Sequence, residues 1–205
     1  MEELTNILTE RNRLKTPAII EAFRKIDRAD FTPLSEKHRA YYDIPIPIGY
    51  GQTISQPSTV VFMLEQLQPQ KGDKILDVGF GSGWVTALLA QIVGISGEVY
   101  ALERIEALKA YGEKNIAKYN FIEKGIAKCF CADGTKGLST RAPFDKIIVS
   151  ASAEKIPWPL KEQLKINGRL VIPVLDSIWL IIRKSEDQFD ECEFSGFAFV
   201  PLVKD

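Results

Sequence analysis

Apolar positions along most of this chain follow two alternating patterns: short continuous runs, and longer stretches with helical spacing. From Pro57 onward the runs predict buried strands and the stretches between them predict helices. The predicted helices span residues 57–68, 85–93, 105–119 and 159–165, and the predicted strands span 74–78, 98–102, 126–130, 145–149 and 169–174. Strands that alternate with helices form parallel βαβ units. The predicted fold class is α/β, with a doubly wound, mostly parallel sheet.

The two ends of the chain depart from this alternation. Near the N-terminus, Thr16 followed by Pro17 is typical of a helix start, and apolar residues then recur at helical spacing as far as Ile26. Near the C-terminus, the β-rich runs 179–183 and 193–200 are separated only by a polar segment. That spacing favours an antiparallel pair. We therefore expect an N-terminal helical region and a C-terminal antiparallel edge.

A segment rich in proline and glycine, residues 43–57, precedes the alternating core. It also contains apolar residues, which favours an ordered loop over a flexible linker, and long ordered loops often carry function. The length of 205 residues predicts one domain. Within it we distinguish residues 1–56 (N-terminal helices and the loop), 57–174 (the α/β core) and 175–205 (the β-rich edge).

Composition and charge exclude several classes of function. The chain has 26 basic and 27 acidic residues without a run of one sign, so no nucleic-acid partner is expected. The first sixteen residues are rich in charge, and no apolar stretch is long enough to span a membrane, which predicts a cytoplasmic protein. Three cysteines without CxxC spacing and a single histidine predict neither a disulfide framework nor a metal site.

A glycine-rich turn follows the predicted strand 74–78 and opens the next helix. Gly79, Gly81 and Gly83 allow a sharp turn and a close approach of ligand to backbone. A dinucleotide-binding turn would place a further glycine three residues after Gly81, where this chain has Trp84. A plain structural turn is the alternative reading, because glycines alone are a weak signal.

Acidic residues at the ends of the predicted strands point to the ligand of this turn. Glu103 ends the second strand, where a carboxylate can accept hydrogen bonds from both ribose hydroxyls. Asp133 and Gly134 follow the third strand, in a position to hold the amine of an adenine. Asp77 supplies an anion beside the turn, which suits the amino group and positive sulfur of S-adenosylmethionine. We predict that S-adenosylmethionine, rather than a nicotinamide dinucleotide, binds here.

The chain resembles the protein-L-isoaspartate O-methyltransferases from about Thr16 to Leu202. The most specific match lies in the loop 43–57, at Pro47, Gly49, Gly51, Gln52, Thr53, Ile54, Ser55 and Pro57. Supporting matches are the segments 131–137, 142–153, 160–174 and 199–202. The chain departs from the family pattern in the turn Leu175–Ile178, where a glycine and a glutamine are common, and at Ala132, where glycine is usual.

The resemblance implies a Rossmann-like class I methyltransferase fold and a repair enzyme. Its acceptor would be the side-chain carboxylate of L-isoaspartyl residues in damaged proteins and peptides, with D-aspartyl residues as an open extension. S-adenosyl-L-homocysteine would be the product of the methyl donor, and a monomer is expected. The implied active-site residue is Ser55, with Thr53 and Ile54 beside it and Ser150 and Ala151 on a facing loop. The implied cofactor contacts are Asp77, Gly79, Gly81, Gly83, Glu103, Asp133 and Gly134.

Other functions compatible with a methyl donor remain as alternatives. Amino-adenine methyltransferases carry an Asn/Asp-Pro-Pro-aromatic motif after the fourth strand, but this chain has serine and alanine at 150–152. Cytosine C5 enzymes need a Pro-Cys nucleophile, and no proline precedes a cysteine here. A relative with another carboxylate acceptor, or one that recognises isoaspartyl segments with little turnover, is suggested only by the turn at 175–178. For Ser55 itself, the alternative role is to cap the helix that begins at Pro57.

Overall fold

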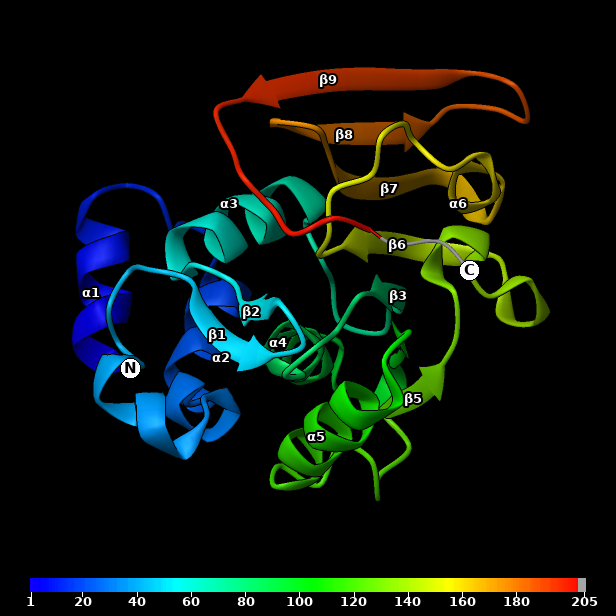
Figure 1. Cartoon of the computed structure of the whole chain (residues 1–205). Coiled ribbons are helices and arrows are strands. Elements are labelled where there is room, and N and C mark those ends of the chain that lie inside the picture. Colours follow the sequence, from blue (N-terminus) through cyan, green and yellow to red (C-terminus); the bar gives the residue numbers. More distant parts are fainter. Residues whose placement is uncertain (203–205) are drawn as a thin grey trace.

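A seven-stranded sheet forms the centre of the structure, a computed structural model that describes residues 1–202 (Figure 1). Its strands lie in the order β5, β4, β3, β6, β7, β8, β9, of which the first five are parallel and the last two antiparallel. The strands are β3 (Lys74–Val78), β4 (Glu98–Glu103), β5 (Ala127–Cys131), β6 (Phe144–Val149), β7 (Leu164–Val174), β8 (Ser177–Arg183) and β9 (Phe189–Ser195). The predicted doubly wound, mostly parallel sheet with an antiparallel edge is confirmed.

Side chains on the two faces of the sheet belong to two separate cores. Along β3, Ile75 joins one core, whereas Leu76 and Val78 join the other. The larger core also draws on α1 (Glu2–Glu10), α2 (Pro17–Lys25), α3 (Pro57–Leu67), α4 (Trp84–Val93) and α5 (Glu106–Ala117). The smaller core is covered by α6 (Trp158–Glu162) and by the segments around the 3-10 turns η4 (Gly134–Lys136) and η5 (Ser139–Arg141). Burial on both faces explains why the central strands are mostly apolar.

The order of the strands places a crevice at the carboxyl ends of the parallel strands. The chain runs outward from β3 through β4 to β5 and then returns to β6 on the other side of β3. Val78 and Val149, the last residues of β3 and β6, are therefore neighbours. In doubly wound sheets ligands bind outside the carboxyl ends of the strands at this reversal.

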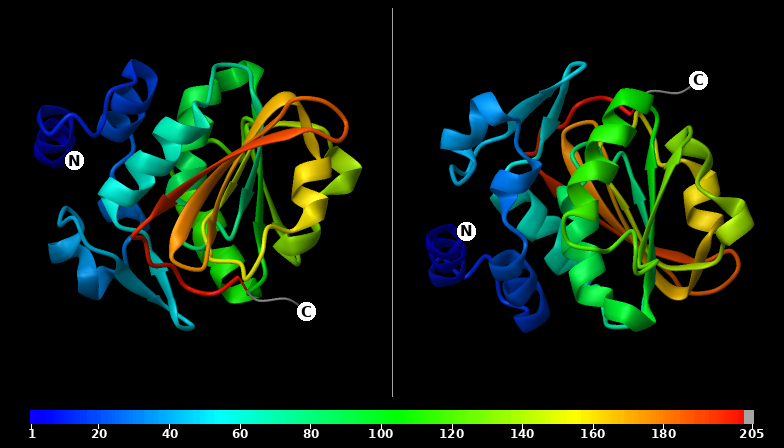
Figure 2. Two further views of the ribbon diagram at one scale, coloured as in Figure 1. Left: turned by 90° about the horizontal axis from the view of Figure 1, so that it is seen from above. Right: turned by 90° about the horizontal axis from the view of Figure 1, so that it is seen from below.

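The N-terminal region contains more regular structure than the sequence pattern indicated. The segment 43–57, expected to be a loop, folds into an antiparallel pair, β1 (Ile46–Gly49) and β2 (Gln52–Ile54). Before it lie the 3-10 turns η1 (Arg28–Phe31) and η2 (Leu34–Arg39), and η3 (Gly94–Ser96) follows α4. The N-terminal helices and this pair lie on the side of the molecule that carries α3 and α4 (Figure 2). Thr16 precedes α2 as predicted, but its hydroxyl donates to Glu65 (2.7 Å) instead of capping the helix.

Several predicted boundaries near the C-terminus were wrong. The last strand occupies 189–195 rather than 193–200, because β9 is an edge strand whose polar side chains face solvent and hide the strand pattern. The apolar residues after it pack elsewhere: the ring of Phe197 lies 5.0 Å from that of Phe62 on α3. The short helix α6 ends at Glu162, and β7 begins at Leu164, five residues earlier than its predicted start at Arg169.

Candidate active site

The β1–β2 pair leads directly into the segment that carries Ser55. Its turn contains three consecutive residues in the left-handed region, Gly49 (φ 94°), Tyr50 (φ 54°) and Gly51 (φ 71°). Ser55 lies between the end of β2 and the start of α3, and it is half-buried. It does not cap α3, because the position before the helix is Gln56 and no side-chain cap is formed. The capping role for Ser55 is therefore wrong.

The predicted glycine turn connects β3 to α4 and is held against β4. The backbone N–H groups of Gly79 and Phe80 both donate to the carbonyl of Leu102, at 2.8 and 3.2 Å. Gly79, Gly81 and Gly83 all have positive φ, which favours glycine at each position. Their surroundings differ, however. A Cβ at Gly79 would meet only Ala151, at 3.9 Å, whereas a Cβ at Gly83 would lie 2.7 Å from the side chain of Ile116 on α5.

Glu103 at the end of β4 is fixed by the same turn. One carboxylate oxygen accepts from the N–H of Gly81 (3.0 Å), and the other accepts from the N–H of Ile105 (2.9 Å). The side chain is 7% exposed and lines a cavity. Because each carboxylate oxygen has two acceptor sites and residues 1–202 occupy one on each, both oxygens keep one site for a ligand hydroxyl.

Asp77 lies behind the glycine turn, in the middle of the sheet. It is fully buried; one oxygen accepts from the hydroxyl of Thr86 (2.6 Å), and the other has no hydrogen-bond partner among residues 1–202. Burial raises the pKa of Asp77 to about 7; the Thr86 hydrogen bond opposes this rise, and the charge of Glu103 adds to it. Asp77 does not line the cavity, so a direct contact with the methyl donor stays a prediction.

Asp133 and Gly134 follow β5, as predicted, and form a short 3-10 turn. One oxygen of Asp133 accepts from both the N–H and the hydroxyl of Thr135, at 2.9 and 2.8 Å. Burial opposes ionisation of Asp133, but the bonds from Thr135 and the charge of Lys136 outweigh it and hold its pKa below the ordinary value. A Cβ on Gly134 would lie 2.2 Å from Val78, so this glycine permits close packing on β3.

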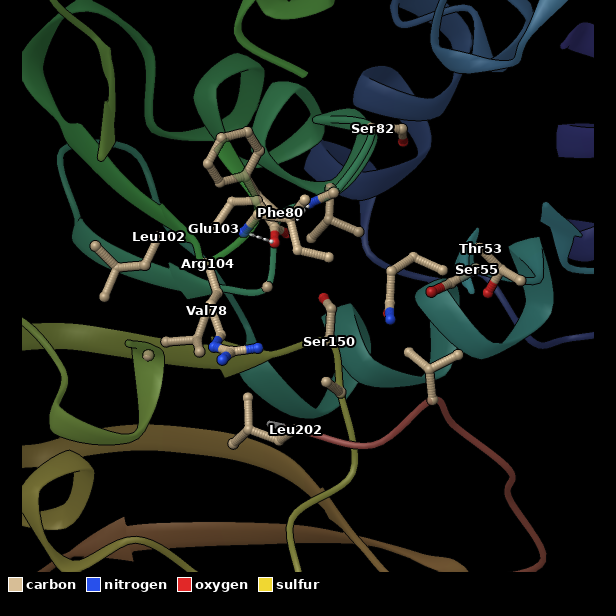
Figure 3. A pocket seen from close by; sticks show the side chains of 18 of the residues that line it. Thr53, Ser55, Val78, Phe80, Ser82, Leu102, Glu103, Arg104, Ser150 and Leu202 are labelled. Carbon is tan, nitrogen blue, oxygen red and sulfur yellow. Dashed lines mark hydrogen bonds between the residues drawn. The ribbon is translucent and has the colours of Figure 1, made fainter. Parts of the chain in front are cut away.

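A single cavity brings most of the predicted site residues together at the carboxyl ends of β3, β4 and β6. It is lined by Thr53, Ile54, Ser55, Gly79, Gly81, Glu103, Gly134, Ser150 and Ala151. Asp77, Gly83 and Asp133 do not line it. In Figure 3, Thr53 and Ser55 lie on one side of the cavity, Glu103 lies on the other, and Ser150 points between them. The cavity therefore joins the glycine turn to the hydroxyl groups of the segment after β2.

Comparison with known proteins identifies the family. A model of the family described as protein-L-isoaspartate(D-aspartate) O-methyltransferase matches residues 1–205. The chain belongs to this family. Curated family members include a protein-L-isoaspartate O-methyltransferase from Methanopyrus kandleri, 39% identical over 206 residues that cover 98% of this chain and 90% of the relative. Another, from Flavobacterium psychrophilum, is 44% identical over 206 residues, covering 99% and 93%.

A solved structure agrees with this assignment. A crystal structure from Plasmodium falciparum, assigned as a protein-L-isoaspartate O-methyltransferase in complex with S-adenosyl-L-homocysteine, has a TM-score of 0.90 and 25% sequence identity, covering 99% of this chain and 98% of that chain. The resemblance to the family seen in the sequence is therefore confirmed, as is the Rossmann-like class I methyltransferase fold.

The C-terminal segment forms a part of the cavity wall that was not among the predicted site residues. After β9 the chain leaves the edge of the sheet and crosses to the cavity, where Val200, Pro201 and Leu202 line it (Figures 1 and 3). Two hydrogen bonds hold it to Ser152, from the Ser152 N–H to the carbonyl of Val200 (2.8 Å) and from the Leu202 N–H to the carbonyl of Ser152 (2.7 Å). The family match at 199–202 was the available signal, but the predicted strand 193–200 placed the first part of this segment in the sheet.

The turn at 175–178, where the chain departs from the family pattern, is joined to the same loop. Leu175 adopts a left-handed conformation (φ 54°) and its side chain is 67% exposed. Its N–H donates to Ala153 (3.1 Å), and its carbonyl accepts from the hydroxyl of Ser152 (3.0 Å). The altered turn thus keeps hydrogen bonds to the loop that begins with Ser150, in a backbone conformation that glycine would adopt with less strain.

Proposed function

We propose that this chain is a protein-L-isoaspartate O-methyltransferase that transfers the methyl group of S-adenosylmethionine to the side-chain carboxylate of L-isoaspartyl residues in damaged proteins and peptides. Membership of the family over residues 1–205 supports this function, as does the S-adenosyl-L-homocysteine bound in the Plasmodium falciparum structure. The observation that carries it is the single cavity in which Glu103 and the glycine turn face Thr53, Ser55 and Ser150.

The residues around the glycine turn suit S-adenosylmethionine. Both oxygens of Glu103 are held in place by backbone N–H groups, and within the described part of the chain each keeps one acceptor site for a hydroxyl of the ribose. The space beside Gly79 is open to a ligand. One oxygen of Asp77, behind the turn, has no hydrogen-bond partner in the described range 1–202, and it is a buried acceptor that the positive amino group of the donor would satisfy.

The acceptor chemistry explains why the site needs no general base. A carboxylic acid has a reference pKa near 4, so the isoaspartyl side chain is already an anion at neutral pH. When bound, S-adenosylmethionine supplies a methyl group on a positively charged sulfur. The remaining task of the protein is to align the carboxylate oxygen with this methyl group, and positioning of this kind can supply roughly 7–11 kcal/mol of barrier reduction.

We assign the alignment of the acceptor to the hydroxyl of Ser55. A hydroxyl donates one hydrogen bond to a carboxylate and leaves the carboxylate its negative charge. A strong cationic clamp would bind the ground state more tightly than the transition state, in which that charge is lost, and would slow the attack. Thr53, Ile54, Ser150 and Ala151 then form the substrate side of the cavity, where main-chain groups can recognise the kinked isoaspartyl backbone independently of the flanking side chains.

Transfer of a labelled methyl group to an isoaspartyl peptide tests the function. We expect base-labile label on the isoaspartyl peptide and none on a peptide of the same sequence with normal aspartate; a third peptide, with D-aspartate, tests the wider specificity. Label that resists base would indicate an acceptor other than a carboxylate. Binding of S-adenosyl-L-homocysteine without any transfer would favour a recognition module over an enzyme.

We also propose that residues 1–205 act as one cytoplasmic, monomeric domain without a nucleic-acid partner. One buried core contains residues from Leu4 in α1 to Leu180 in β8, which supports a single folding unit. Cys129, Cys131 and Cys192 are free, as is usual in a reducing compartment. No helix within residues 1–202 has the length and apolar character of a membrane span. Light scattering of the purified protein measures its oligomeric state.

A further inference from the structure

Arg28, on the turn η1, is a fully buried charged residue. Its relative exposure is 0%, and burial lowers its pKa to about 10, with the charge of Asp43 opposing this decrease. The guanidinium therefore stays protonated at neutral pH. Burying a charge is unfavourable unless it gains strong hydrogen bonds in return. Within residues 1–202, every hydrogen-bond partner of this guanidinium is a main-chain carbonyl.

These carbonyls belong to the segment that leads to Ser55. One terminal nitrogen donates to Ala40 (2.7 Å) and Tyr42 (3.3 Å). The other donates to Ile44 (2.9 Å) and Ser55 (3.0 Å). Ile44 lies just before β1 and Ser55 just after β2, so the second nitrogen joins the two ends of the β1–β2 pair. Arg28 thus bonds directly to the backbone of Ser55.

The same guanidinium contacts the donor side of the cavity. Its central carbon lies 5.2 Å from the ring centroid of Trp84, within range of a cation–π interaction. Trp84 is 1% exposed, begins α4 immediately after Gly83 and lines the cavity. Its ring is also held edge-on by Phe23 of α2, with 5.5 Å between the centroids. One side chain therefore touches both the helix after the glycine turn and the backbone of Ser55.

We propose that Arg28 is a positioning residue for methyl transfer. It fixes the position of Ser55 and the β1–β2 pair relative to the glycine turn. The proposal rests on the proposed function, in which Ser55 orients the acceptor and the turn binds the donor. Arg28 lines no part of the cavity and acts through these two elements. Arginine suits this role because its planar fork can serve two pairs of carbonyls while its face lies on an indole. The ammonium group of a lysine has neither the forked donors nor the planar face.

Substitution of Arg28 by lysine, with a matched control, tests the proposal. Arg183 also donates to four main-chain carbonyls, those of Glu162, Leu164, Ser185 and Glu186, but it lies away from the cavity. Both Arg28→Lys and Arg183→Lys are expected to lower Tm. Only Arg28→Lys should lower kcat, by roughly 100-fold, because a displacement of about 1 Å at a reacting group has an effect of this size. The Kd of S-adenosyl-L-homocysteine should change less than threefold.

A double substitution separates positioning from a general loss of structure. Assays use S-adenosylmethionine at about 100 times its Kd, which keeps a destabilised variant folded. If Arg28 acts through Ser55, Arg28→Lys should lower kcat much less in a Ser55→Ala background than in the wild type. Full additivity of the two effects, an unchanged kcat in Arg28→Lys, or an equal loss of kcat in Arg183→Lys would overturn the proposal.

A second variant covers the case in which Arg28→Lys does not fold. Trp84→Phe keeps the four hydrogen bonds of Arg28 and weakens the stacking on its face, although it also shortens a ring that packs against Phe23 and lines the cavity. It is expected to lower kcat by roughly threefold to tenfold, since a phenyl ring binds a cation less strongly than indole. Wild-type kcat in Trp84→Phe would then refute the proposal. Failure of the wild-type protein itself to methylate the isoaspartyl peptide would instead refute the proposed function.

Discussion

Replacing Asp77 with asparagine should change how the stability of the protein depends on pH. The carboxyl group is fully buried behind the glycine turn, and burial raises its pKa from 3.8 to about 7. In the unfolded chain the same group returns to its ordinary value. The difference between the two states corresponds to about 4 kcal/mol of folding free energy.

The sign of the effect follows from the direction of the change. Because the pKa of Asp77 is higher in the folded state, its contribution to stability is complete below about pH 4 and is lost as the pH rises through about 7. Asparagine has no proton to lose. Relative to Asp77→Asn, the wild-type free energy of unfolding should therefore fall by about 4 kcal/mol between about pH 4 and pH 7.5. Urea unfolding of both proteins across this range, without S-adenosylmethionine or its product, measures the difference.

Thr86 provides an independent check of the same reasoning. Its hydroxyl donates to Asp77 and lowers the carboxyl pKa, so Thr86→Val should extend the loss of stability to pH values above 7. If the free energies of unfolding of the wild type and Asp77→Asn changed equally with pH, Asp77 would not titrate between about pH 4 and pH 7.5. The argument from burial would then fail.

The Asp77→Asn variant also tests the predicted contact between Asp77 and the donor. If the ionised carboxylate faces the amino group of S-adenosyl-L-homocysteine, the affinity for this product should increase as the pH rises through about 7 in the wild type. It should change much less in Asp77→Asn. Calorimetric titrations of both proteins at several pH values distinguish these results, and equal pH dependence would exclude the contact.

Four further substitutions probe the cavity. Ser55→Ala should lower kcat while the Kd of S-adenosyl-L-homocysteine stays within about twofold, and Ser58→Ala, on α3, serves as its control; an equal loss in both kinetics and affinity would mean that Ser55 is only structural. Glu103→Gln should weaken product binding by about 1.5–3 kcal/mol in calorimetry, as expected for hydrogen bonds to a charged group. Gly83→Ala should destabilise the fold by about 1–3 kcal/mol in urea unfolding, because the added Cβ overpacks against α5 and the backbone has positive φ. Leu175→Gly should raise the free energy of unfolding by about 0.5–1 kcal/mol in urea, because glycine relieves the left-handed strain. A change in KM for the isoaspartyl peptide would show that the Leu175 side chain also contacts the substrate.

Much of the architecture follows from the sequence because parallel sheets leave a strong local signal. Strands buried on both faces must be apolar throughout, and the helices between them must carry apolar residues at helical spacing. The glycines at 79, 81 and 83 and the acidic residue Glu103 could also be predicted, since backbone conformation and the ends of strands constrain residue type locally. The sequence therefore determined the fold class, the family and nine of the residues that line the cavity.

Tertiary structure decided what depends on contacts between distant segments. The edge strand β9 has polar side chains that face solvent, so its pairing with β8 left no apolar pattern to find. Asp77 and Glu103 are both acidic residues at strand ends, yet only packing places Glu103 in the cavity and Asp77 behind it. Arg28 joins residues 40, 42, 44 and 55 through their main-chain carbonyls, and its guanidinium lies over the ring of Trp84. Every residue has such a carbonyl, so no sequence pattern records which ones a buried guanidinium will meet.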